Sequence, residues 1–222
     1  MLSRHEEKYI LTYAQYAVLL QRVRSVLTPD AHGTNGSYTV TSLYFDDLED
    51  TGLMEKLDGL KLHSKFRLRT YDHTHKIIKL ERKDKQGILT KKLSATVSKE
   101  QLPLLTQPGS WDCFEGNAQA LTQQLQSRLY TPKVAVRYLR DAFYFQGTDL
   151  RITFDRQLEA LPPDFNVLFD PNFHGIPAIE PGNVVMEIKY GTYLPSFVRK
   201  LTRVRAPQLS LSKYALCRGV IL

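Results

Sequence analysis

The chain has 222 residues, a length that suits one domain with its own core. Hydrophobic residues make up 42% of it, which is ordinary for a globular protein and excludes a low-complexity or disordered chain. The formal net charge of +7 indicates an anionic partner: nucleic acid, an acidic membrane or phosphate. Charge alone does not choose among these, and a basic surface that only serves solubility is an equal alternative.

Three features of the sequence bear on where the protein works. Cys113 and Cys217 form no CxxC motif, which predicts two free thiols in a reducing cytoplasm. Charged residues follow the first Met almost at once, so no signal peptide is expected. The chain has no apolar run of about 18 residues, so no membrane span is expected. We therefore expect a cytoplasmic protein with one domain over residues 1–222.

The first quarter of the chain predicts two strands and two helices. Residues 4–11 are typical of a strand, and Thr12 and Gln15 then form a capping box for a helix with apolar residues at 3–4 spacing. Residues 38–45 are rich in β-branched and aromatic residues, which predicts a strand. A short helix is expected around residues 50–58.

The rest of the chain predicts strands separated by short breaks, with one long helical region and one proline-rich loop. In chain order, the predictions are strands at 62–71, 75–83 and 87–94, helix and loop at 98–129, strands at 133–139, 141–147 and 150–156, a loop at 157–182, a strand at 184–190 and helix from Pro195. Short breaks favour antiparallel neighbours, and there is no regular βαβ alternation. The sequence therefore predicts an α+β fold: a mostly antiparallel, eight-stranded β-barrel with flanking helices.

Charged residues collect on one side of several predicted strands, because side chains alternate between faces with period two. The residues that share such positions are Glu6 and Lys8, then Lys65, Arg67 and Arg69, then Lys79, Glu81 and Lys83, then Arg151 and Asp155, and finally Glu187 and Lys189. Glu-x-Lys thus recurs in three strands. If these faces point into a barrel, its interior holds many cations and a few carboxylates.

Such an interior suits a chain of phosphates. A triphosphate carries about four negative charges, and Arg replaces its water shell with a bidentate fork. Carboxylates among the cations are favourable where they hold Mn²⁺ or Mg²⁺, and phosphoryl transfer needs mainly positioning and charge neutralisation. The alternative is an ordinary solvated strand face. Against it stand the five arginines in predicted strands: Arg67, Arg69, Arg137, Arg140 and Arg151.

No competing chemistry is indicated by a motif. The chain has no P-loop, no GxGxxG fingerprint and no GxSxG elbow, and its histidines lack metal-ligand spacing. A nucleic-acid binder would need exposed basic residues with stacking aromatics, for which Tyr44 and Tyr71 are available. The inward faces argue against that use.

At this point the motifs themselves resemble a known family, the catalytic domain of the vacuolar transporter chaperone (VTC), a polyphosphate polymerase among the triphosphate tunnel metalloenzymes. The matching stretches run in family order over nearly the whole chain: RHEEKY, SLYFDD, KFRLRTY, KLERKDK, TKKL, VRYLRDAF, LRITFDR, VMEIKY and LSKY. The resemblance implies a tunnel that binds the triphosphate of ATP and a growing polyphosphate, with Mn²⁺ or Mg²⁺ as cofactor. It implies three sets of site residues. They are catalytic Arg67, Arg69, Lys83, Arg140 and Arg151; phosphate-binding Lys8, Lys79, Lys91, Arg137, Lys189 and Lys213; and metal-binding Glu187, with Glu6 and Glu81 assisting.

Two assignments stay open at this level, Lys91 against Lys92 and Arg140 against Arg137. One departure bears on the subfamily: Arg4 stands where the related CYTH hydrolases and cyclases have the first Glu of Glu-x-Glu-x-Lys. Fewer carboxylates fit the polymerase branch. Since the chain starts at the first barrel strand, neither a preceding regulatory domain nor a membrane segment is expected.

The activity that the resemblance implies is transfer of the γ-phosphate of ATP to polyphosphate. The alternatives are a tripolyphosphatase or nucleoside triphosphatase of the same fold, and a module that binds polyphosphate without catalysis. Nucleic acid is not an expected partner, and the sequence gives no oligomeric state.

Overall fold

The computed structural model describes residues 5–31, 36–87 and 89–221. Arg4, on which the subfamily argument depends, lies outside the described residues. Strands account for most of the regular structure, and each long strand overlaps a segment predicted as strand. The strands are β1 His5–Leu11, β2 Thr28–Pro29, β3 Ser37–Asp46, β4 Leu62–Tyr71, β5 Ile78–Gln86, β6 Leu89–Val97, β7 Thr131–Tyr144, β8 Arg151–Leu161, β9 Ile176–Pro177 and β10 Val184–Tyr190.

The helices are short and connect these strands. They are α1 Tyr13–Arg24, α2 Thr51–Leu57, α3 Gly116–Ser127, α4 Ser196–Leu201 and α5 Lys213–Arg218, with 3-10 turns at Pro103–Thr106, Ser110–Cys113 and Phe165–Leu168. The predicted capping box is confirmed, because the side chain of Thr12 accepts from the Gln15 amide while the Gln15 side chain accepts from the Thr12 amide.

The strands form one ten-stranded sheet in which eight follow the order β1-β10-β8-β7-β3-β4-β5-β6, while β2 pairs with β7 and β9 with β8. The pairs of known register are antiparallel. The α+β class with a large antiparallel sheet is therefore confirmed. Among the described residues no pair between β1 and β6 closes this order into a ring, so the eight-stranded barrel stays a prediction.

The chain divides into two compact units. Unit 1 contains residues 1–39, 138–158 and 179–211, and unit 2 contains residues 40–137, 159–178 and 212–222. Strands β3, β7 and β8 each contribute residues to both units. The prediction of a single domain stays a prediction, and each unit is described by itself below.

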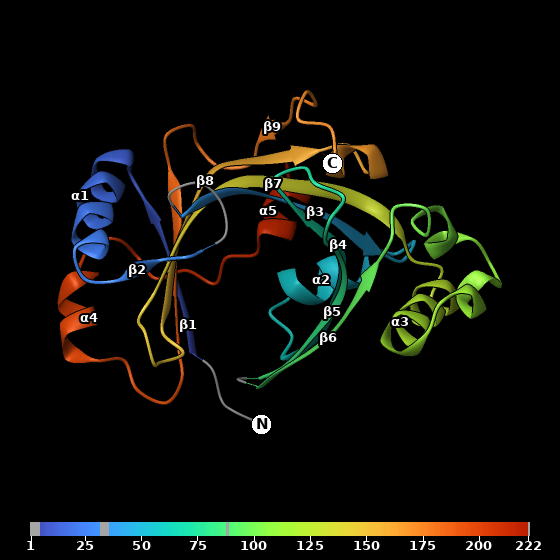
Figure 1. Cartoon of the computed structure of the whole chain (residues 1–222), viewed down its shortest axis with the longest axis horizontal. Helices are drawn as coiled ribbons and strands as arrows, with labels where there is room; N and C mark the ends of the chain where they lie inside the picture. The colour runs from blue at the N-terminus through green and yellow to red at the C-terminus, as the bar shows by residue number, and fades with distance from the viewer. Residues whose placement is uncertain (1–4, 32–35, 88, 222) are drawn as a thin grey trace. The chain divides into compact units, whose positions relative to one another are not determined.

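The core of unit 1 lies between its helices and the apolar sides of β8 and β10. Leu19 and Val23 of α1 pack with Ile152, Phe154 and Met186, all at most 2% exposed. Helices α1 and α4 cover the same side of the strands (Figure 1). Burial of each such side chain stabilises the fold by about 1.5–3 kcal/mol. The opposite side of β10 is thereby left to Glu187 and Lys189.

The core of unit 2 uses the same principle. Phe66, Leu68 and Leu80, on one side of β4 and β5, pack with Leu121 and Leu125 of α3. Helix α3 lies against β5 and β6 on this side (Figure 1). Because neighbouring side chains along a strand alternate, packing this side against α3 fixes the other side of β4–β6 as the charged one.

The structure corrects the predicted break at Arg140. The segments 133–139 and 141–147 were predicted as two strands, but residues 131–144 form the single strand β7. Arg140 and Asp141 do not interrupt the strand because each is paired, Arg140 with Asp155 and Asp141 with Arg156. The 157–182 loop prediction is also wrong at its start, since β8 continues to Leu161.

Candidate functional site

Unit 2 carries a strand face whose charged side chains are almost all positive. In the register of β4, β5 and β6, Lys65 lies opposite Lys83 and Lys83 opposite Lys92, while Arg69 lies opposite Lys79. We call this side the cationic face. On these three strands it contains seven cations, Lys65, Arg67, Arg69, Lys79, Lys83, Lys85 and Lys92, and a single carboxylate, Glu81.

The arrangement is unfavourable for the protein alone. Like charges directly opposite each other in a sheet are destabilising, whereas an ordinary solvated face mixes the two signs. The row of Lys65, Lys83 and Lys92 runs across three neighbouring strands. A bound polyanion would turn this repulsion into attraction, so the row favours anion binding over a solvated strand face.

Glu81 organises the middle of the cationic face. It is 3% exposed and receives Arg67 through Nε and Nη2, each 2.7 Å from Oε2, and Lys92 through Oε1. Burial by itself would raise the pKa of this carboxyl, yet the charges of Arg67 and Arg69 and the hydrogen bond from Lys92 lower the pKa to about 2. Glu81 is therefore ionised at neutral pH and holds the Arg67 guanidinium in place.

The lowered pKa of Tyr44 reflects the positive charge around Glu81. Its phenol accepts a 3.2 Å hydrogen bond from Arg67 Nη1 and is 7% exposed. Burial would raise the pKa of Tyr44, but the charges of Arg67, Arg69 and Lys213 lower the pKa below its usual value. A buried phenol becomes more acidic only where positive charge is in excess.

Helix α5 brings Lys213 to this region. The Tyr214 ring, next in the chain, stacks on Tyr44 with centroids 5.1 Å apart, and its hydroxyl donates to Asp46 at 2.7 Å. Lys65 donates to Ser212, the N-cap of α5, at 2.7 Å. The predicted Lys213 thus belongs to the same unit as the cationic face, next to Tyr44.

Unit 1 carries a strand face with both signs of charge, which we call the mixed face: Glu6, Lys8, Arg140, Arg151, Asp155, Glu187 and Lys189. In the antiparallel register Lys8 lies opposite Glu187 and Glu6 opposite Lys189. Two Glu-x-Lys pairs running in opposite directions therefore place each carboxylate against an ammonium. Lys8 Nζ lies 2.9 Å from Glu6 and 3.6 Å from Glu187, and Lys189 Nζ lies 3.0 Å from Glu187.

The arginines of unit 1 are also paired with carboxylates. Arg140 donates from Nε and Nη2 to the two oxygens of Asp155, at 2.6 and 2.8 Å. Asp155 is fully buried, and although burial disfavours the charged guanidinium, the Asp155 charge raises the pKa of Arg140 well above its ordinary value. Arg151 donates to Asp30 at 2.5 Å and to the Tyr38 hydroxyl at 2.8 Å. The fork of each arginine is thus held in a fixed orientation.

The oxygen atoms around Glu187 suit a hard divalent cation. Glu187 is 5% exposed and lies opposite Thr153, whose buried Oγ1 makes no hydrogen bond within the described residues. Glu6 lies one strand away on the same face. In the described part of the chain, no three His, Cys, Asp or Glu side chains gather into a metal site of their own. Mg²⁺ is commonly held by one or two carboxylates together with substrate phosphates, and this donor set fits that mode.

Two of the residues implied by the resemblance lie apart from these faces. Lys91 lies opposite Asp84, on the side of β6 away from Lys83, whereas Lys92 lies on the cationic face. Arg137 donates to Glu159 at 3.0 Å and to the backbone oxygen of Phe173. Its guanidinium ties down the loop after β8 in unit 2. The structure therefore favours Lys92 over Lys91 and gives Arg137 a structural contact.

Several residues of these faces are absent from the predicted site residues. Lys65 was placed on the charged side of its strand but not among the site residues, and Lys85 follows the same alternation as its neighbours and could have been included on that signal. Thr153 and Asp30 carry no such signal, because their importance depends on what lies opposite them.

The fold resembles that of solved proteins of low sequence identity. A candidate adenylate cyclase from Bacillus halodurans superposes with a TM-score of 0.54 at 12% identity, covering 95% of this chain and 96% of that one. A chain of the Schizosaccharomyces pombe Mediator head module gives a TM-score of 0.51 at 8% identity, covering 92% and 96%. At such identities the likeness concerns the fold alone.

A family model for the VTC domain matches residues 3–221. The chain therefore belongs to the VTC domain family, as its motifs predicted. A search among curated proteins finds no matching sequence. Within the described ranges, no helix has both the length and the apolar character needed to cross a bilayer.

Proposed function

We propose that this protein is a metal-dependent polyphosphate polymerase that transfers the γ-phosphate of ATP to the end of a polyphosphate chain. The observation that carries the proposal is the cationic face, on which seven cations share one carboxylate. Membership of the VTC family supports a triphosphate as the ligand. A face with this charge excess is suited to a flexible polymer of phosphates more than to a ligand with one or two charges.

In this proposal the cationic face binds phosphate oxygens. Arg67 and Arg69 bind non-bridging oxygens of the transferred group with their forks, and Lys83 and Lys92 neutralise neighbouring phosphates. Lys79 and Lys213 bind further along the chain. Glu81 acts through Arg67 by holding its guanidinium, which makes it a positioning residue in place of the metal ligand predicted from sequence.

The mixed face supplies the remaining roles. On this face Arg140 and Arg151 would neutralise phosphate charge, and Lys8 and Lys189 would bind phosphate oxygens. Glu187, with Glu6 and the hydroxyl of Thr153, would hold the metal. The resemblance of the motifs to the triphosphate tunnel metalloenzymes supports a divalent metal here. A divalent ion bound there supplies neutralisation of charge that develops on the leaving diphosphate.

The proposed reaction needs no general base. A terminal oxygen of polyphosphate is already ionised near neutral pH, so it attacks the γ-phosphorus directly and in line. One phosphorus–oxygen bond forms at that oxygen, the bond between the γ-phosphorus and the β,γ-bridging oxygen breaks, and ADP leaves with that oxygen. The protein contributes position and charge neutralisation, which are what the two faces can provide.

The test is incubation of the purified chain with ATP, a short polyphosphate primer and Mn²⁺ or Mg²⁺. We expect one ADP for each phosphate added to the polyphosphate chain, with ADP measured by chromatography and chain length by gel electrophoresis. Release of free phosphate without chain growth would instead establish a hydrolase. Tight polyphosphate binding with no turnover, unchanged in Glu187→Ala, would establish a non-catalytic binding module.

A further inference from the structure

The positive charge of this protein is concentrated at its C-terminal end. After Glu187 the sequence contains no Asp or Glu, but it contains seven Lys and Arg, which equals the whole net charge of +7. Residues 1–187 therefore contain equal numbers of positive and negative residues. Four of the seven cations follow one another on α4 and the segment after it: Arg199, Lys200, Arg203 and Arg205.

These four cations differ from the arginines of the mixed face. All four are exposed, and within the described residues none of them takes part in an ion pair. Arg140 and Arg151, by contrast, each have a carboxylate. Exposed cations without a carboxylate partner, close together in the chain, produce a positive local potential that attracts an anionic surface.

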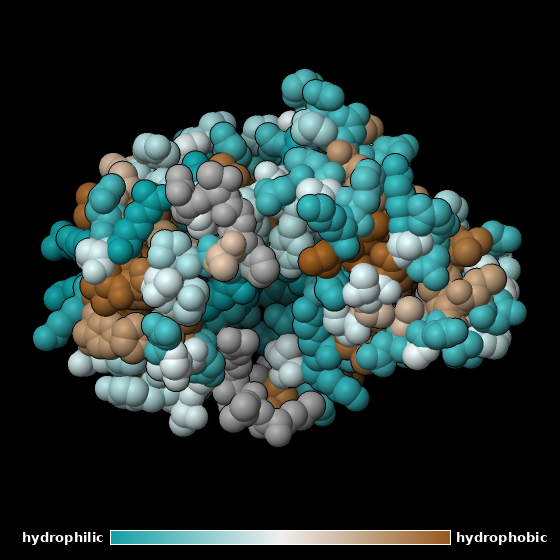
Figure 2. Space-filling model, in the orientation of Figure 1, coloured by the Kyte–Doolittle hydropathy of each residue, from teal (hydrophilic) through white to brown (hydrophobic). Residues whose placement is uncertain are grey.

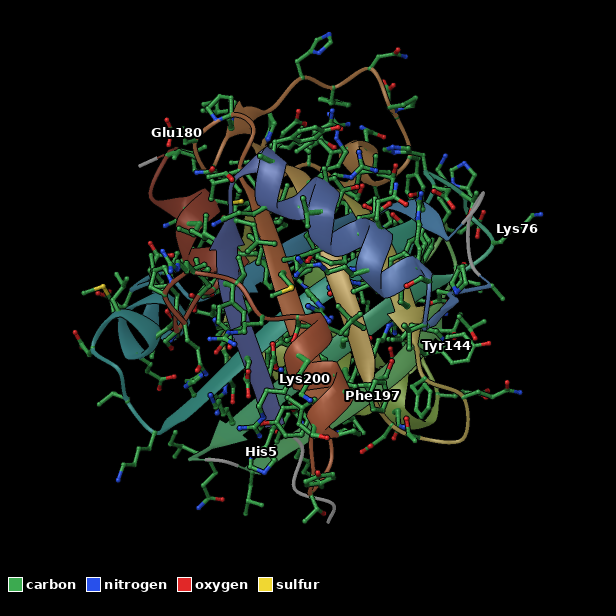
Figure 3. All side chains as sticks on the ribbon, turned by 90° about the vertical axis from the view of Figure 1, so that its left-hand side faces the viewer. His5, Lys76, Tyr144, Glu180, Phe197 and Lys200 are labelled. Atoms are coloured by element: carbon green, nitrogen blue, oxygen red, sulfur yellow. The ribbon has the colours of Figure 1, made fainter. Side chains whose placement is uncertain are left out.

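Aromatic side chains accompany the cations. Phe197 is 39% exposed and Tyr193 is 70% exposed. Phe197 and Lys200 are one helical turn apart and so share one side of α4, whereas Val198 faces the core of unit 1. Figure 3 shows Phe197, Lys200 and Tyr144 on the side of unit 1 that carries α1 and α4. Phe197 also packs on Phe145, with ring centroids 5.3 Å apart.

Exposed apolar residues also lie on and just after α1. Val18 of α1 is 52% exposed and Val26, two residues after the helix, is 45% exposed; α1 packs against α4. The space-filling view shows apolar side chains at the surface beside these two helices, on the left of Figure 2. Side chains of this kind adjacent to Lys and Arg are typical of surfaces that sit in the headgroup region of a bilayer.

We propose that Tyr193, Phe197, Arg199, Lys200, Arg203 and Arg205, here the α4 surface, bind the headgroup region of an anionic phospholipid bilayer. The cations pair with lipid phosphates, and the aromatic rings enter the interface between headgroups and acyl chains. Inorganic polyphosphate has no apolar part and gives the exposed rings no partner. A single nucleic-acid strand stacks on rings along a groove, and it gives the aliphatic Val18 and Val26 no partner.

The test is sedimentation of the full chain with vesicles at increasing salt. We expect binding to vesicles that contain phosphatidylglycerol, loss of that binding at high salt, and no binding to pure phosphatidylcholine. The variant Lys200→Gln/Arg203→Gln should bind about 25-fold more weakly, since each cation near an anionic surface contributes about fivefold. Tyr193→Ser should weaken binding further without changing its salt dependence.

A matched control removes the same charge elsewhere. Lys61→Gln/Lys76→Gln lowers the net charge equally, from exposed positions of unit 2, and should leave vesicle binding unchanged. Equal losses in both double variants would overturn the proposal, and so would failure to bind anionic vesicles. A loss seen with single-stranded DNA or polyphosphate but not with vesicles would overturn it in favour of that polyanion.

The inference does not depend on the proposed phosphate transfer. No residue of the α4 surface belongs to the cationic or the mixed face. Lys200→Gln/Arg203→Gln should therefore form ADP from ATP in solution at the wild-type rate, if the chain is a polymerase. Vesicle binding by a chain without polymerase activity would still support the α4 surface and would count only against the proposed function.

Discussion

The two charged faces of this protein differ in how their positive charges are neutralised. On the mixed face of unit 1 every arginine and lysine named above has a carboxylate near it, so the face is close to neutral by itself. On the cationic face of unit 2, the seven cations of β4–β6 share that face with one carboxylate, Glu81. One face is stabilised by its own pairs, and the other has charge left for a ligand.

The difference separates stability from binding. Breaking a buried pair leaves a charge without compensation, which is expensive for the fold. Removing a cation from a crowded row relieves repulsion and affects mainly the anion that the row would bind. Variants of the mixed face should therefore act first on folding, and variants of the cationic face first on phosphate chemistry.

The largest expected effect follows from Asp155→Ala in unit 1. This change leaves the Arg140 guanidinium, 8% exposed, without its bidentate partner, and should lower the free energy of unfolding by about 3–5 kcal/mol. Urea denaturation followed by circular dichroism measures the loss. The double variant Asp155→Leu/Arg140→Met should recover much of it, and no recovery would show that the pair is not the cause.

The cationic face should show the opposite behaviour in Arg69→Ala. The Arg69 side chain makes a 3.1 Å hydrogen bond to Ser42, and its removal leaves no carboxylate without a partner. We expect kcat/KM for ATP to fall by about 10²–10³-fold, the typical effect of losing one charge-stabilising donor. The midpoint of urea denaturation should stay within error of the wild type. A stability loss as large as that of Asp155→Ala would remove the distinction between the faces.

Glu81 is the one residue of the cationic face that we expect to contribute strongly to stability, and the pH dependence of stability tests this. Its pKa of about 2 lies below the ordinary 4.5, so its contribution to stability is present above pH 4.5 and is lost as pH falls toward 2. Glu81→Gln should be destabilised by about 3 kcal/mol at pH 7 and by much less near pH 2. The exposed Glu49→Gln is the control, and a pH-independent difference for Glu81→Gln would contradict the assignment.

The smallest expected effect is a difference in phosphate binding between variants of two neighbouring residues of β6. Lys92 lies on the cationic face and Lys91 on the opposite side, and both are exposed. Lys92→Ala should weaken tripolyphosphate binding about tenfold in titration calorimetry, and Lys91→Ala should leave it unchanged. The reverse result would place the register of the β5–β6 hairpin one residue out.

Much of the fold was accessible from local sequence pattern. The alternation in KFRLR separates Arg67 and Arg69 from Phe66 and Leu68, and the structure keeps that separation. The capping box at Thr12 and Gln15 depends on residues three apart, so it too is a local feature. The motifs in chain order also predicted the VTC family, which the family model confirms.

What a local pattern does not contain is the partner across the sheet. The sequence did not decide whether Lys91 or Lys92 is the phosphate ligand, because the two point to opposite sides of one strand. Only the register with Lys83 shows which of them lies on the cationic face. It split β7 at Arg140 because the partner Asp155 comes from another strand.

Sequence by itself therefore determined which side chains share a face, since strand alternation is set by the backbone of each residue and its neighbours. The tertiary structure decided which charges are neutralised and which are left for a ligand. Asp30 reaches Arg151 across 121 positions of the chain, and Lys8 meets Glu187 through the register of β1 with β10. Such pairs form only when distant strands pack, because Coulomb attraction depends on distance in space and not along the sequence.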